Sequence, residues 1–96
     1  MSLKLKINGD KADLSMIIIS AARYALGRRT YIVQWTCEFI ENNINLLIEK
    51  DLYVMLHDIN QQEKSYGLGD DCDIECWHSL RRKLEEEIYE RNNWKI

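Results

Sequence analysis

The chain has 96 residues, of which 46% are hydrophobic and 30% are charged, a balance that is typical of a globular domain and excludes intrinsic disorder. Its formal net charge of −3 argues against direct nucleic-acid binding, because neutralising phosphates requires a basic face. The longest apolar run, Met16 to Ile19, is far shorter than the roughly 20 residues that span a bilayer, and the N-terminal segment lacks the apolar run of a signal peptide. We therefore expect a cytoplasmic protein with no membrane partner.

The first ten residues carry a strand-like pattern. Leu3, Leu5 and Ile7 alternate with polar residues, and the sequence NGD that follows is a turn signal. No second convincing strand is available to pair with residues 3–7. Two interpretations stay open, a short edge strand completed by another copy of the chain, or a frayed arm.

Two helices are predicted next, separated by four residues. The first runs from Asp13, a capping residue, to Leu26, and Gly27 is a natural C-terminal stop. The second runs from about Tyr31 to Glu49, with Thr30 as the cap. Its apolar stripe has helical spacing and consists of Ile32, Trp35, Phe39, Ile40, Ile44, Leu47 and Ile48.

The second half of the chain predicts two further helices. Asp51 is a candidate cap for the third helix, although the sequence EKD contains no strong breaker and the second and third helices could be continuous. Periodicity stops between Gln61 and Asp71, which predicts the main loop, and a last helix starts at about Asp73. The absence of proline also favours helices over β-turns. The sequence thus predicts one all-α domain over residues 1–96, a three- or four-helix bundle with a short N-terminal strand or arm.

The expected core is thin. A chain of this length buries a limited apolar surface, so we expect a homo-oligomer. Trp35 and Trp77 lie on apolar stripes, where large rings usually pack inward, and both are predicted to be buried. Cys37 lies in an apolar run and is interpreted as a core residue.

The junction between the first two helices is the first candidate site. The opening turn of a helix leaves amide hydrogens unpaired and carries partial positive charge, and Arg28 and Arg29 lie directly before it. Arginine binds phosphate or carboxylate through two parallel hydrogen bonds. An anionic ligand is therefore one interpretation, and arginines that pair with glutamates or are solvated at a helix end are the other. The candidate ligand-binding residues are Arg23, Tyr24, Arg28, Arg29, Thr30 and Tyr31.

The remaining chemistry-bearing residues do not form a catalytic or metal motif. Cys72 and Cys76 would share a helix face, but His78 points elsewhere and a structural zinc site needs a second pair of ligands. Cys76 and His57 could form a nucleophilic pair, yet nothing in the sequence brings them together. We therefore expect a protein that is not an enzyme and has no metal and no cofactor.

One resemblance bears on the setting. Residues 23–31, with the sequence RYALGRRTY, resemble small uncharacterised proteins of phages and prophages in Gram-positive bacteria. Residues 70–80, within the sequence GDDCDIECWHSL, resemble the same proteins more loosely. The similar residues cover about a quarter of the chain. The resemblance carries no catalytic residues to transfer, and it implies an accessory or anti-defence protein in the cytoplasm of a host cell.

Two functions follow as hypotheses. In the first, the protein binds an anionic small molecule such as a nucleotide signal at the arginine junction, with Tyr24, Tyr31 or Tyr66 stacking on it. In the second, it is an anti-CRISPR-like inhibitor whose acidic residues imitate nucleic-acid phosphates and occupy a host nuclease or another defence protein. These acidic residues are Asp70, Asp71, Asp73, Glu75 and those from Glu85 to Glu90. A phage structural component is a third alternative.

Overall fold

Four α-helices and one short 3₁₀ helix make up the described structure, a computed structural model covering residues 11–28 and 30–93 and their side chains except Lys11 and Thr30. The helices are α1 (Lys11–Ala25), α2 (Thr30–Asn42), η1 (Ile44–Leu46), α3 (Glu49–Ser65) and α4 (Asp71–Asn93). The prediction of a helical bundle is confirmed. The predicted strand at residues 3–7 lies outside the described residues.

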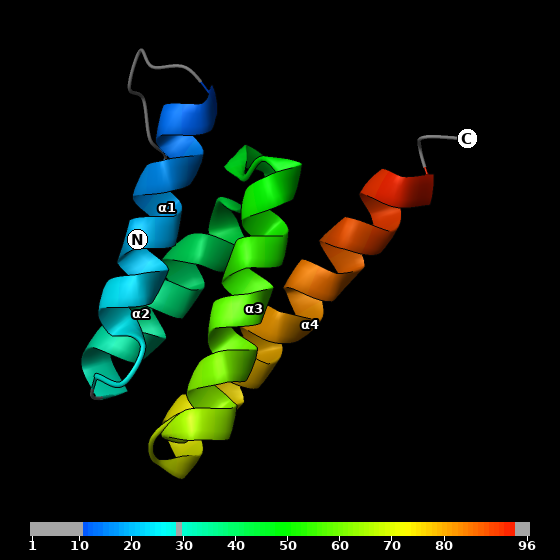
Figure 1. The fold of residues 1–96 in the computed structure, drawn as a ribbon. Helices are drawn as coiled ribbons and strands as arrows, with labels where there is room; N and C mark the ends of the chain where they lie inside the picture. The colour runs from blue at the N-terminus through cyan, green and yellow to red at the C-terminus, as the bar shows by residue number, and fades with distance from the viewer. Residues whose placement is uncertain (1–10, 29, 94–96) are drawn as a thin grey trace.

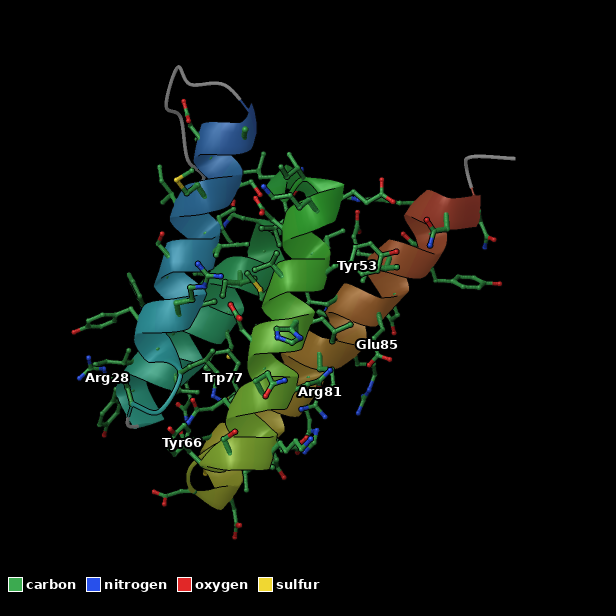
Figure 2. The ribbon with its side chains drawn as sticks, viewed as in Figure 1. Arg28, Tyr53, Tyr66, Trp77, Arg81 and Glu85 are labelled. Carbon is green, nitrogen blue, oxygen red and sulfur yellow. The ribbon has the colours of Figure 1, made fainter. Side chains whose placement is uncertain are left out.

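Each helix packs against two others. α2 contacts α1 and α4, and α3 also contacts α1 and α4, so the four helices surround one core (Figure 1). α4 crosses the bundle obliquely, and its C-terminal part extends beyond the other helices in Figure 1. Trp77 of α4 is fully buried between the helices, as predicted (Figure 2). The apolar core residues are Ile18, Ile19, Ala22, Ala25, Val33, Cys37, Ile40, Leu47, Leu52, Met55, Ile59, Leu68, Trp77, Leu80 and Leu84.

The predicted continuation of the second helix to Glu49 is wrong, because α2 ends at Asn42. The side-chain amide of Asn43 donates to the carbonyl oxygen of Phe39 at 2.8 Å and so satisfies one of the last carbonyls of the helix. Beyond η1, Leu47 and Ile48 are extended. The second and third helices are therefore separate.

Arg91 of α4 holds this connection in place from far along the chain. Its guanidinium donates to the carbonyl oxygens of Leu47 at 2.6 Å and Ile44 at 3.3 Å, while its Nε donates to Glu87 at 2.7 Å. The connection contains no glycine or proline. Its carbonyl groups are satisfied by a tertiary contact, which local sequence patterns do not reveal.

Three other boundaries differ from the sequence predictions. α1 begins at Lys11 and α3 at Glu49, so Asp13 and Asp51 lie inside the first turns and are not the caps. Carboxylates there still interact favourably with the helix dipole. α3 continues to Ser65, because the residues after Gln61 include glutamine, glutamate and lysine, which are good helix formers even where no apolar stripe continues. The predicted long loop is therefore reduced to residues 66–70.

The prediction that Trp35 is buried is also wrong. α2 carries two adjacent apolar stripes, and the one that faces the core contains Val33, Cys37 and Ile40. Trp35 and Ile32 lie on the other stripe and are exposed. Cys37 is buried, which confirms its interpretation as a core residue.

Candidate functional site

The junction between α1 and α2 is built as a tight reversal of the chain. Gly27 has a φ of 80°, a left-handed conformation that glycine adopts at little cost. The amide of Arg28 donates to the carbonyl oxygen of Ala25 at 2.9 Å, and α2 begins two residues later at Thr30. A Cβ at Gly27 would lie 3.4 Å from the side-chain nitrogen of Gln62, so the junction packs closely against the end of α3.

Arg28 lies folded over Tyr24 at this junction. Its Nε donates to the carbonyl oxygen of Tyr24 at 3.3 Å, and its Cζ lies 4.9 Å from the centre of the Tyr24 ring, a cation–π contact. Both side chains are exposed, and Arg28 projects from the edge of the molecule in Figure 2. Tyr31 is also exposed. Arg29 and the side chain of Thr30 lie outside the described part of the structure.

Arg23 faces a different side of α1. Its Nε donates to Oδ2 of Asp58 on α3 at 2.9 Å. Arg23 and Tyr24 are adjacent in α1, which places their side chains about 100° apart around the helix. Arg28 lies beyond the end of α1 and folds back over Tyr24. The predicted set is therefore divided, with Arg23 directed toward α3 and Arg28 stacked on Tyr24 on the outer side.

A cleft of about 300 Å³ lies between the C-terminal ends of α1 and α3. Arg23 and Asp58 form part of its wall, and Tyr66 at its rim has 86% of its surface exposed. Gln62 contributes an amide whose nitrogen donates to the carbonyl oxygen of Gly67 at 3.2 Å. The remaining lining residues are Leu26, Gln61 and Ser65.

Sequence reasoning found Arg23 and Tyr66 but missed the polar residues of α3 that share this cleft. Asp58, Gln61, Gln62 and Ser65 recur at helical spacing and lie on one side of α3. That spacing was the available signal. The predicted loop from Gln61 onward gives these side chains no common face, whereas α3 continues to Ser65 and aligns them.

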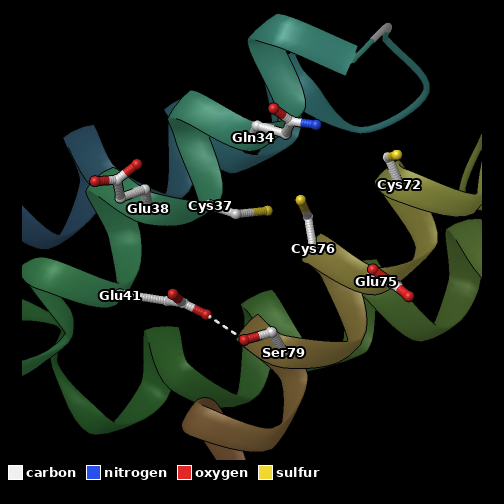
Figure 3. A pocket seen from close by; sticks show the side chains of 8 residues that line it. All are labelled: Gln34, Cys37, Glu38, Glu41, Cys72, Glu75, Cys76 and Ser79. Carbon is white, nitrogen blue, oxygen red and sulfur yellow. Dashed lines mark hydrogen bonds between the residues drawn. The ribbon is translucent and has the colours of Figure 1, made fainter.

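A second cleft, of about 420 Å³, lies between α2 and α4. Figure 3 shows the sulfur atoms of Cys37 and Cys76 directed toward one another at its base. Ser79 donates a hydrogen bond to Oε1 of Glu41 at 2.9 Å beside them. The lining residues are Gln34, Cys37, Glu38, Glu41, Cys72, Glu75, Cys76 and Ser79, among which there are three glutamates and no basic residue.

The two facing thiols are poor nucleophiles at neutral pH. Burial raises the pKa of Cys37 well above the ordinary thiol value, and the nearby Cys76 acts in the same direction. Burial also raises the pKa of Cys76, with a further contribution from the charge of Asp73. Because the thiolate is the reactive form, neither Cys37 nor Cys76 is activated as a nucleophile, and His57 does not belong to the lining residues of this cleft.

Residues 11–28 and 30–93 contain no group of three or more histidine, cysteine or acidic side chains that could hold a metal ion. None of the helices within these ranges has the length and hydrophobicity that crossing a membrane requires. Comparison of the chain with protein-family models, curated proteins and solved structures found no match. The case for a function therefore rests on the geometry of this chain.

Proposed function

We propose that this protein is a non-enzymatic binding protein that takes a small, planar, anionic ligand, such as a nucleotide, in the cleft between α1 and α3. The observation that carries the proposal is the position of Arg23 in the wall of this cleft, held by Asp58 at 2.9 Å. The volume, about 300 Å³, is at the lower end of the range for small-molecule sites.

The contact with Asp58 orients the arginine and uses only its Nε donor. Asp58 accepts from Nε, and among the described residues no further acceptor is found for the two terminal amino groups of Arg23. These two amino groups can donate hydrogen bonds to one or two oxygens of a phosphate. Because Asp58 cancels the charge of Arg23, affinity would come from paired hydrogen bonds and ring stacking, with little long-range attraction.

Tyr66 completes the proposed site. Its ring is exposed at the rim and belongs to the same cleft as Arg23, so it can stack on a planar base. The side-chain oxygen of Gln62, whose nitrogen is held by Gly67, can accept a hydrogen bond from a base edge. A phosphate on Arg23 and a base on Tyr66 would thus occupy opposite parts of the cleft.

The biological setting that we propose is a phage accessory or anti-defence protein that sequesters a nucleotide signal. This setting rests on the resemblance of residues 23–31 and 70–80 to phage and prophage proteins. Sequestration requires binding without turnover, and the raised pKa values of Cys37 and Cys76 disfavour a thiolate nucleophile at either of these two residues.

Thermal denaturation with a ligand panel tests the proposal. The panel consists of AMP, cyclic AMP, cyclic dinucleotides and inorganic phosphate, and a ligand at 100 times its Kd should stabilise the fold by about 2.7 kcal/mol. Arg23→Ala should abolish the shift, whereas Arg82→Ala, which removes an exposed arginine of α4, should preserve it. If no member of the panel raises the Tm, the proposed ligand class is wrong. If Arg23→Ala responds like the wild type, the proposed site in the α1–α3 cleft is wrong.

A second candidate function is inhibition of a basic partner such as a host nuclease, and the α2–α4 cleft favours it. Glu38, Glu41 and Glu75 line that cleft without a basic residue, so a lysine or arginine of a partner would be attracted there. Asp73 cannot belong to such a surface as predicted, because it is buried, and Glu87 is paired with Arg91. Replacing the three cleft glutamates by glutamine should abolish capture of a purified nuclease at low salt, and unchanged capture would refute this function.

A further inference from the structure

Large apolar side chains are exposed on the outer side of the α1–α2 hairpin. Trp35 and Tyr24 have 58% and 59% of their surface exposed, and Ile17 and Ile32 have 44% and 41%. None of these four residues belongs to the buried core. We call this surface the hairpin face and define it by Ile17, Ala21 and Tyr24 of α1 and Ile32, Trp35 and Phe39 of α2.

Helical geometry places these six residues on one surface. Positions 17, 21 and 24, like positions 32, 35 and 39, recur every three or four residues and so share one side of their helix. Other sides of the two helices are occupied by neighbouring helices, because Arg23 of α1 faces α3 and Gln34 of α2 lines the cleft with α4. The two apolar sides therefore adjoin each other along the contact between α1 and α2.

The exposed area of the hairpin face lies within the range of the largest apolar patch on a typical monomer. The four exposed fractions together equal about two whole side chains, or on the order of 400 Å² at about 200 Å² for a large side chain. A typical monomer has its largest apolar patch at about 300–600 Å², and such patches often mark interaction sites. Two copies packed through this face would bury about 800 Å² of apolar surface. If apolar atoms contribute the fraction of the buried area that is usual in homodimers, the total interface area is about 1,200 Å². This value is the lower limit for stable association.

The charges at the two ends of the hairpin face are opposite. Arg28 lies on Tyr24 at one end, and Asp13 is exposed near the other end of α1. Asp13 and Tyr24 are eleven residues apart, which is about three turns and roughly 16 Å, so they project from the same side. An antiparallel two-fold arrangement would place Arg28 of each copy near Asp13 of the other. A parallel arrangement would bring the two arginines together, which is unfavourable.

We propose that the protein forms an isologous homodimer through the hairpin face, with Trp35 of each copy near the two-fold axis and Arg28 paired with Asp13 of the partner subunit. The face is self-complementary in charge, because Arg28 lies at one end and Asp13 at the other, as a two-fold interface requires. The dimer leaves the α1–α3 cleft open, because Arg23 lies on the other side of α1. This proposal therefore does not depend on the ligand proposed above.

Sedimentation equilibrium of the full chain tests the dimer. The wild-type mass should rise from 11.5 kDa toward twice that value as the concentration rises from about 1 to 300 μM, because an interface near the lower size limit is expected to be of micromolar affinity. Trp35→Ser should weaken association at least about 100-fold, since a central tryptophan dominates such interfaces. The matched control is Tyr89→Ser, which removes an exposed aromatic residue of α4 and should leave the mass unchanged.

Charge exchange tests the arrangement separately. Arg28→Asp and Asp13→Arg should each weaken association about tenfold at low salt, and the double variant should restore it because the pair is re-formed with reversed sign. Far-ultraviolet circular dichroism verifies that every variant is folded. A wild-type mass of 11.5 kDa at 300 μM, or a dimer that survives Trp35→Ser, overturns the proposal. If the double variant associates as weakly as the single variants, the antiparallel arrangement is wrong. Trp35→Ser should still show the rise in Tm with nucleotide, which separates the dimer proposal from the proposed ligand site.

Discussion

Ser15→Ala should destabilise the fold far more than the loss of one hydroxyl group suggests. The Ser15 side chain is fully buried, donates to Oδ2 of Asp51 at 2.6 Å and accepts from the amide of Ile48 at 3.0 Å. It thereby joins α1 to the start of α3. The substitution removes a partner from two groups at once, a nearly buried carboxylate and a backbone amide.

The magnitude follows from these two losses. A buried polar group that loses its partner costs about 1–3 kcal/mol, so we expect a loss of about 2–4 kcal/mol, with water at the partly accessible Asp51 reducing the upper value. A chain of this length has a total stability of roughly 5–14 kcal/mol. The Tm should fall by about 10–20 °C.

Ser79→Ala is the matched control. Ser79 also donates to a carboxylate, that of Glu41 at 2.9 Å, but this hydrogen bond is exposed. Because both variants replace a helical serine by alanine, the gain in helix propensity is the same in both. Urea denaturation of the two variants measures the difference, and equal free energies of unfolding within 0.5 kcal/mol would show that the buried contact does not have the assigned role.

Three further substitutions or conditions probe other parts of the structure. Gly69→Ala should destabilise the start of α4 by about 1–3 kcal/mol in urea denaturation, because φ is +106° and the added Cβ would lie 2.7 Å from Oδ2 of the buried Asp73; an unchanged midpoint would contradict the strain. Arg91→Ala should increase amide hydrogen exchange in residues 44–48 by at least tenfold, because two carbonyl oxygens there lose their donor, and exchange equal to wild type would exclude this support. Burial raises the folded-state pKa of Cys37, so its contribution to stability is fully present below the unfolded thiol pKa of about 8.5 and is lost as the pH rises above it. Mass spectrometry after alkylation at pH 7 should accordingly find the exposed Cys72 modified before Cys37, and equal rates would contradict the burial.

The helices could be predicted from the sequence because apolar residues recur at helical spacing and Gly27 provides a local stop. The end of α2 could not be predicted, since it depends on Asn43 within the helix terminus and on Arg91 nearly fifty residues away. Local propensity contains no information about such a tertiary partner. The same limit explains why the α1–α3 cleft was found only in part, because its wall combines α1 with polar residues of α3 that lack an apolar stripe.

Trp35 illustrates a different limit. Periodicity identifies which residues share a helix face, but α2 has two apolar faces side by side, and both satisfy the rule for burial. The face with Val33 and Cys37 packs inside, and the face with Ile32 and Trp35 does not. The excess of apolar residues on α2 therefore indicates more apolar surface than one core-facing stripe can bury.

The extensive contact between α2 and α4 has a consequence during synthesis. The inner stripe of α2 is complete once residue 42 has been made, yet the helix that covers it begins at Asp71 and supplies Trp77 and Leu84 later still. Until then the nascent α1–α2 hairpin has apolar residues on both its inner and outer sides. Early pairing of two ribosome-bound chains, or a chaperone holding the unfinished chain, would shield that hairpin until about the last quarter of the polypeptide emerges.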